Sequence, residues 1–396
     1  MTFFESSSFY AEIINFFRYT LQLQKGPHVG YLDVHKECGM PGIYIGSTVP
    51  RSGKSLLSFS LGVLLQKAGY SVGYMKPLGR IPQKRDELVG DADALVVQEV
   101  LGQDVPADVL SPVMIPGDLH SLSMQNESAD VVMRRISMAY ERISAGKDFT
   151  LVSGSGSFPA TGRFCNADGL RVLRTLGLKI LFVERFAGRF HYDALLFLKD
   201  LLGPDMLGIV FNDVPDEELR GATKLLIPYL RERGVHVLGI LGREPGLAAM
   251  RVTELAQGLC GHIVAGNAHA ARMVDSFLIG TMQVDNFMMH LRQQAGCAVI
   301  VGGDRADLQL AALHASSPCI ILTGNIAPSE LIRSRAEAMG VALVCVREDT
   351  YTVARAMSRI LMAKKLRDLN QIRLAVNLVE NTLDIQSILD RIASTA

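Results

Sequence analysis

The sequence predicts an α/β protein in which a large parallel-sheet domain is followed by a smaller α/β domain. Three observations lead to this prediction. Short apolar runs recur along the chain, segments with helical periodicity separate them, and the first run ends in a glycine- and serine-rich loop. Near-continuous Val, Ile and Leu runs are typical of strands buried on both faces, and their alternation with helices favours parallel order. The first series of runs lies at 42–47, 71–77, 149–154, 179–184, 207–212 and 235–241.

The segments between these runs have the spacing of helices that cover a sheet. They are found at 55–67, 168–175, 192–201 and 217–233. The stretch 80–148 is polar and mixed, so we expect it to form a longer excursion over the ligand site.

A second series of apolar runs follows residue 247 and predicts a separate α/β domain. Its strands are expected at 297–303, 318–324 and 342–348, with helices at 283–295, 305–315, 328–339 and 350–362. The chain is therefore predicted to have four parts: an N-terminal extension at 1–40, a first domain at 41–246, a second at 247–362 and a C-terminal helix at 363–396. The amphipathic pattern of the last part suits packing against a partner or a second copy, so we expect a homo-oligomer.

Composition excludes several classes of function. The 396 residues include 40 Lys and Arg and 40 Asp and Glu, so no excess of charge draws the chain to nucleic acid or to a membrane surface. No apolar run reaches membrane-spanning length, and the first residues lack the basic and apolar regions of a signal peptide. The six cysteines form no CxxC pair. We expect a reduced, cytoplasmic protein.

The loop after the first apolar run reads GSTVPRSGKS. It ends in Gly-Lys-Ser as phosphate-binding loops do, although its first glycine lies two positions earlier than the usual spacing requires. A helix that begins here offers unpaired N–H groups and partial positive charge to phosphate. Lys54 can reach the β- and γ-phosphates and the Ser55 hydroxyl can bind Mg²⁺, whereas the alternative is a polar turn without a ligand. The candidate nucleotide contacts are Gly46, Ser47, Thr48, Ser52, Gly53, Lys54 and Ser55.

This loop, with GYSVGYMKPLG at 69–79, resembles the P-loop NTPase domain of dethiobiotin synthetase-like proteins, and is most similar to the N-terminal region of long phosphotransacetylases. Further matches follow in order, as GDADALVVQEVLG at 90–102, CNADGLRVLRTLGLKILFV at 165–183 and GIVFNDVPDEEL at 208–219. The resemblance implies that ATP or a related nucleotide binds with Mg²⁺. It implies Asp91 or Asp93 as a magnesium ligand beside Ser55, and Asn212 near the adenine. Lys54 and Lys76 would act at the transferred phosphate.

The second domain resembles the DRTGG domain through GGDRADLQLAAL at 302–313 and LTGN at 322–325, with Ala306 in place of Thr and Asn325 in place of the last Gly. We expect Gly303, Asp304 and Arg305 to form a turn where a phosphate or carboxylate binds, although Asp304 would equally serve as a plain helix N-cap. The resemblance covers roughly 42–362, and we expect a chain without the phosphotransacetylase catalytic domain.

Two departures from the family pattern weaken the prediction of catalysis. Dethiobiotin synthetases have an Asp in the loop and a Glu after the following strand, whereas this loop has no acidic residue and Ser153 stands at the Glu position. A hydroxyl is a weaker ligand for a hard dication than a carboxylate. We therefore expect a nucleotide-binding protein that is regulatory or senses a small molecule, with weak or no turnover. The alternative is an ATP-dependent ligase that acts on a small carboxylate, as dethiobiotin synthetase or cobyrinic acid a,c-diamide synthase does.

Overall fold

The computed structural model describes residues 42–85, 87–115, 127–187, 190–294, 296–315, 317–362 and 369–394. Its internal contacts divide the chain into two units, Met1–Arg243 with Arg367–Ala396, and Glu244–Leu366. The extension predicted at 1–40 lies outside the described residues. None of the helices in the described ranges is long and apolar enough to cross a membrane.

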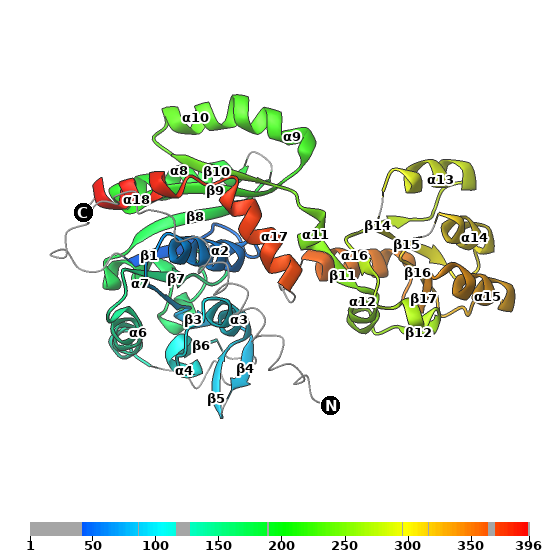
Figure 1. The fold of residues 1–396 in the computed structure, drawn as a ribbon, viewed down its shortest axis with the longest axis horizontal. Helices are drawn as coiled ribbons and strands as arrows, with labels where there is room; N and C mark the ends of the chain where they lie inside the picture. Colours follow the sequence, from blue (N-terminus) through cyan, green and yellow to red (C-terminus); the bar gives the residue numbers. More distant parts are fainter. Residues whose placement is uncertain are drawn as a thin grey trace. The chain divides into compact units, whose positions relative to one another are not determined.

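The first unit is built on a six-stranded sheet whose strands are all parallel (Figure 1). The strand order is β10-β9-β8-β1-β7-β2. Each strand coincides with one of the six apolar runs of the sequence, which confirms the predicted fold class. The strands are β1 (Gly42–Gly46), β2 (Val72–Met75), β7 (Phe149–Ser153), β8 (Lys179–Arg185), β9 (Met206–Val214) and β10 (Val237–Gly242).

Helices connect these strands because parallel neighbours need a crossover. Helix α2 (Lys54–Lys67) follows β1 and packs against β1, β2 and β7. Tyr44, Val152 and Phe182 share one core with residues of α6 and α7. The other helical segments of this part are α6 (Ala129–Ser144), η1 (Arg163–Cys165), α7 (Gly169–Leu176), α8 (Phe190–Leu202), η2 (Gly203–Asp205), α9 (Asp216–Gly221), η3 (Ala222–Leu226) and α10 (Ile227–Glu232).

The expected excursion at 80–148 contains small elements of its own. A two-stranded antiparallel ribbon leads into α3, a short helix follows, and β6 returns to pair with β3. The elements before α6 are β3 (Leu78–Gly79), β4 (Pro82–Arg85), β5 (Leu88–Asp91), α3 (Ala92–Val100), α4 (Ala107–Leu110) and β6 (Val113–Met114).

The C-terminal helices belong to the first unit. Helix α17 (Leu369–Glu380) packs against α2 (Figure 1), and Lys67 of α2 forms an ion pair with Glu380 at 2.8 Å. In α18 (Ile385–Ser394), Arg391 Nε donates to the carbonyl of Leu207 at 2.7 Å. The apolar face that the sequence pattern assigned to a partner is therefore covered by the chain's own sheet domain, with Ile372, Ala375, Val376 and Val379 buried.

The second unit is a five-stranded sheet in the order β12-β17-β16-β15-β14. Its three central strands are those predicted, whereas β12 and β14 were not expected. Strand β12 runs antiparallel to β17. The strands are β12 (His262–Ala265), β14 (Ser276–Ile279), β15 (Cys297–Gly302), β16 (Cys319–Thr323) and β17 (Ala342–Cys345), with the pair β11 (Met250–Arg251) and β13 (Met273–Val274) beside them. The helical segments are α11 (Pro245–Ala248), α12 (Val252–Gly258), η4 (Asn267–His269), α13 (Val284–Arg292), α14 (Ala306–His314), α15 (Glu330–Met339) and α16 (Thr350–Met362).

Candidate functional site

The loop between β1 and α2 is held in one shape by its glycine and by a residue from a distant strand. Gly53 immediately precedes the helix and has a φ of 105°, a conformation that glycine adopts without strain. Asn212, near the end of β9, donates from Nδ2 to the carbonyl of Ser52 at 2.9 Å. A side chain on Gly53 would lie 2.3 Å from this amide nitrogen. No side chain of the described residues caps α2, so its first N–H groups remain available to a ligand.

Lys54 is a buried ammonium that contacts neutral acceptors. Lys54 is 9% exposed, and its Nζ donates to the Ser47 hydroxyl at 2.5 Å and to the Gly156 carbonyl at 2.8 Å. Burial lowers the pKa of Lys54 to about 8, with a smaller opposing effect of Glu184 and further lowering by neighbouring cations. Because a buried charge is costly without a counter-ion, an anion bound beside this ammonium would be favourable.

Thr48 is held by a carboxylate from β8. Its backbone N–H donates to Oε1 of Glu184 at 2.5 Å and its hydroxyl donates to Oε2 at 2.7 Å. Glu184 is 3% exposed, and burial raises its pKa to about 7, although the hydrogen bonds from Thr48 and the charge of Lys54 act in the opposite direction. The loop that the sequence presents as free of acidic residues therefore has one within hydrogen-bonding distance.

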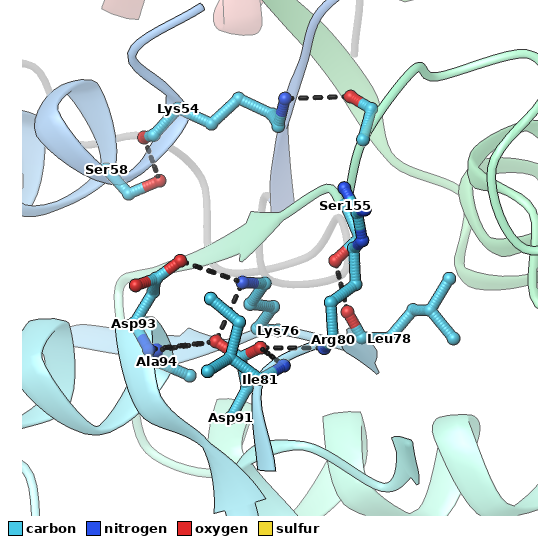
Figure 2. A network of polar contacts seen from close by, with 11 residues as sticks. Lys54, Ser58, Lys76, Leu78, Arg80, Ile81, Asp91, Asp93, Ala94 and Ser155 are labelled. Atoms are coloured by element: carbon cyan, nitrogen blue, oxygen red, sulfur yellow. Dashed lines mark hydrogen bonds and ion pairs between the residues drawn. The ribbon is translucent and has the colours of Figure 1, made fainter. Parts of the chain in front are cut away.

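Lys76, directly after β2, is fixed by two carboxylates (Figure 2). Its Nζ lies 2.7 Å from Oδ1 of Asp91 and 3.6 Å from Oδ2 of Asp93. Asp91 also caps α3 and accepts four backbone N–H groups, those of Arg80, Ile81, Asp93 and Ala94. Burial alone would raise the pKa of Asp91, but Lys76 and these hydrogen bonds outweigh it and hold the pKa below its ordinary value.

The segments that follow β2 and β7 meet around these residues. Gly156, which accepts the Lys54 ammonium, follows β7, and the neighbouring Ser155 hydroxyl donates to the carbonyl of Leu78 after β2. Figure 2 shows the side chain of Arg80 extending from this segment towards the Lys54 end of the network. The positive charges of Lys76 and Arg80 both lower the pKa of Lys54, so three cations act on one region. Carboxyl ends of parallel strands are where such sheets bind ligands.

The predicted magnesium ligands differ in accessibility. Ser55 lies half-buried in the first turn of α2, and the side chain of Asp93 is 28% exposed, whereas that of Asp91 is 0% exposed with its oxygens occupied. Ser153 is the buried last residue of β7. Its hydroxyl occupies the position at which the family pattern has a Glu carboxylate. The described residues contain no group of three or more acidic, His or Cys side chains able to hold a metal. Ser55 and Asp93 are the predicted ligands that would hold a magnesium ion if phosphate and water supplied most of its oxygens.

The predicted site of the second unit lies at the turn after β15. Arg305 pairs with Asp307 at 2.8 Å, and Nε2 of Gln309 donates to the carbonyls of Gly302 and Gly303 at 3.1 and 3.0 Å. The helix α14 begins after Arg305 and has no side-chain cap, so Asp304 does not serve as the N-cap that the sequence allowed.

Sequence patterns did not predict two residues of the candidate site. Glu184 was placed in an apolar strand and given no role, and Arg80 was assigned only to the polar excursion. A signal for Glu184 existed, since it is an acidic residue at the carboxyl end of an otherwise apolar strand, where ligands bind.

The fold and the loop define a protein with a P-loop nucleotide-binding domain. The chain belongs to the AAA domain family, which residues 41–251 match, and residues 254–360 match the DRTGG domain. The predicted combination of a P-loop domain and a DRTGG domain is confirmed.

The relatives belong to the two enzyme classes that the motifs indicated. The chain is 23% identical over 370 residues to the phosphate acetyltransferase of Nitratidesulfovibrio vulgaris, and the aligned residues cover 86% of this chain and 50% of that protein. It is 24% identical over 362 residues to the phosphate acetyltransferase of Pseudomonas putida, covering 84% and 49%. It is 28% identical over 180 residues to the ATP-dependent dethiobiotin synthetase BioD of Methanococcus vannielii, covering 44% and 80%. The chain thus spans about half the length of the phosphate acetyltransferases it matches.

Proposed function

We propose that this protein binds ATP or a related nucleotide at the loop between β1 and α2 and acts as a nucleotide-dependent regulator with weak or no turnover. The observation that supports binding most directly is the Lys54 ammonium. It is buried, it contacts the hydroxyl of Ser47 and the carbonyl of Gly156, and its charge is balanced by no ion pair in the described part of the chain. The β- and γ-phosphates of a nucleotide are the counter-ion that a lysine at this position of a P-loop receives.

Weak turnover is proposed because the site offers few carboxylates to a metal ion. Phosphoryl transfer depends on exact placement of Mg²⁺, which neutralises charge that develops on the phosphates. Asp91 is occupied by Lys76 and four N–H groups, and Ser153 is neutral. Asp93 and Ser55 would then be the protein groups that hold the ion. Binding relies on the loop, the helix N-terminus and Lys54, and needs none of the missing carboxylates.

The regulatory part of the proposal rests on the combination of domains. A P-loop unit whose chemistry is weakened is suited to report whether nucleotide is bound, and the DRTGG unit offers the turn at Gly303–Arg305 to a second, unidentified anionic molecule. Nucleotide occupancy would be transmitted to the second unit or to a partner. The alternative function, an ATP-dependent ligase for a small carboxylate, is supported by the relationship to dethiobiotin synthetase and by the position of Lys76.

Calorimetric titration of the full chain with Mg-ATP tests binding. We expect Lys54→Ala to weaken affinity by about 2–3 kcal/mol, the range for a charge-assisted hydrogen bond. Lys67→Ala is the matched control, since Lys67 ends the same helix and pairs with Glu380 away from the loop. Equal affinity of wild type and Lys54→Ala would place the phosphates elsewhere.

Phosphate release separates the two functions. Wild type should release phosphate very slowly with or without small carboxylates, and Ser153→Glu should strengthen the dependence of binding on Mg²⁺. Wild-type turnover of several per second, stimulated by a carboxylate, would establish the ligase instead.

A further inference from the structure

The carboxylate of Glu184 accepts hydrogen bonds from the phosphate loop. In the register of the sheet, Phe182 of β8 lies opposite Gly46 at the end of β1, so Glu184 stands two residues further on, beside the loop. Both of its oxygens are used by one residue, because Thr48 donates its backbone N–H to Oε1 and its hydroxyl to Oε2. This contact joins positions that are 136 residues apart and leaves Glu184 3% exposed.

No basic side chain in the part of the chain that the structure describes forms an ion pair with Glu184. Its two hydrogen-bond donors are neutral. The charge that acts on it from α2 is Lys54, whose Nζ is bound to Ser47 and Gly156 and not to this carboxylate. On β8 itself the neighbouring Arg185 pairs with Asp213 of β9 at 2.5 Å, and Asp213 also pairs with Arg243. An ionised Glu184 therefore places a buried negative charge next to a loop that is built to receive another anion.

A polyphosphate that enters this loop makes the ionised form of Glu184 less favourable, since two negative charges in a buried site repel each other. Resting on the proposed nucleotide-binding function, we propose that Glu184 takes up a proton when nucleotide binds, so that the affinity of the loop for polyphosphate is coupled to pH. Protonation adds one hydrogen to a carboxylate oxygen and breaks no other bond. The contact with Thr48 survives with one hydrogen bond reversed: Oε1 still accepts the backbone N–H, while the new O–H at Oε2 donates to the Thr48 hydroxyl, which can turn to accept it.

Burial supports this coupling by placing the titration in the right range. With the pKa of Glu184 raised to about 7, the free protein holds a mixture of both forms near neutral pH. Small changes in pH then alter the fraction of molecules whose loop has no competing negative charge.

The test is calorimetric titration of the full chain with Mg-ATP at pH 7.0–7.5, in buffers of different ionisation enthalpy. The dependence of the observed heat on buffer gives the number of protons taken up. For wild type we expect roughly 0.5–0.8 proton from Glu184, the fraction ionised for a pKa near 7. Glu184→Gln keeps the size and the hydrogen-bonding capacity of the side chain but cannot titrate, and its uptake should fall by that amount.

Affinity gives an independent readout. Between pH 6.5 and 8.0 the affinity of wild type should fall by roughly eight- to tenfold relative to Glu184→Gln, because one pH unit corresponds to a tenfold change per proton. Both proteins retain Lys54. Because the charge of Glu184 raises the pKa of Lys54, proton uptake by Lys54 is no smaller in Glu184→Gln, so a lower uptake in that variant comes from Glu184 itself. Mg-ATP binding with the same proton uptake and pH dependence in both proteins would overturn this inference and leave the proposed function intact. Failure of wild type to bind Mg-ATP at any pH would overturn both.

Discussion

The ammonium of Lys76 lies 2.7 Å from a carboxylate oxygen of Asp91, and both side chains are buried at the carboxyl end of the sheet. Because Asp91 also caps α3 and accepts the N–H groups of Arg80 and Ile81, this one carboxylate fixes a lysine, a helix and a turn. The positions of Lys76, Arg80 and Asp93 in the candidate site thus depend on Asp91.

Replacing Asp91 should be strongly destabilising. We expect Asp91→Ala to lower the free energy of unfolding of the first unit by about 3–5 kcal/mol, because it leaves a buried lysine without its partner and removes a helix cap. Asp93→Ala, at 3.6 Å from the same ammonium and partly exposed, should cost about 1 kcal/mol or less. Urea unfolding followed by circular dichroism measures both, since the chain has no tryptophan. Equal losses would show that Asp91 is not the main support of Lys76.

Gly53 should tolerate no side chain. Gly53→Ala introduces strain at a φ of 105° and a clash with Asn212, whose amide nitrogen would lie 2.3 Å from the new carbon. Gly69 is the matched control, since it has a φ of 95° and no atom lies within 4 Å of the position that a side-chain carbon would take there. We expect Gly69→Ala to cost about 1–2 kcal/mol and Gly53→Ala more than that, with a loss of nucleotide affinity only in the latter. The measurement is urea unfolding of both variants beside wild type.

The unliganded protein should not need Lys54 for stability. Burial lowers the pKa of Lys54 to about 8 from an ordinary value of 10.5, so the charged form is less favourable in the folded than in the unfolded chain. Lys54 therefore destabilises the fold below pH 8, and this cost disappears as pH rises towards 10.5. Lys54→Met should leave the melting temperature at pH 7 unchanged or raised while abolishing the stabilisation by Mg-ATP. A clear drop in the melting temperature without ligand would show that the lysine is a structural residue.

Glu184 should make stability fall with rising pH. Its pKa is raised from an ordinary 4.5 to about 7 in the folded chain, so the folded state binds the proton more tightly than the unfolded state. The stabilisation of the folded state by the Glu184 proton is fully present below pH 4.5 and is lost as pH rises through 7. Relative to Glu184→Gln, wild type should lose on the order of 3 kcal/mol across this window, since one unit of pKa corresponds to about 1.4 kcal/mol. Thermal unfolding of both proteins at a series of pH values measures the difference, which should vanish if the carboxylate is solvated.

The second unit should fold without the first. Residue contacts divide it from the first unit as Glu244–Leu366, and it has its own sheet and buried core. Limited proteolysis should cut near 243–250, and a fragment of 244–366 should unfold cooperatively when made alone. A fragment that is unfolded in isolation would show that the two units depend on one another.

Elements that depend on local pattern could be predicted from the amino-acid sequence. Apolar runs that are buried on both faces predicted all six parallel strands of the first unit and the three central strands of the second, and the loop from Gly46 to Ser55 was found because its glycine and lysine spacing is a local property. The edge strands β12 and β14 were missed because they are four residues long and only half-buried, which leaves a weak pattern.

The three-dimensional packing determines which distant residues share the site. The register of β8 beside β1 brings Glu184 to Thr48, and the end of β9 brings Asn212 to Ser52, across separations of 136 and 160 residues. The packing of α17 on α2 likewise covers an apolar face that the sequence could only mark as needing a partner. Sequence periodicity reveals that a face is buried, but the neighbour that buries it is chosen by the packing of the whole chain.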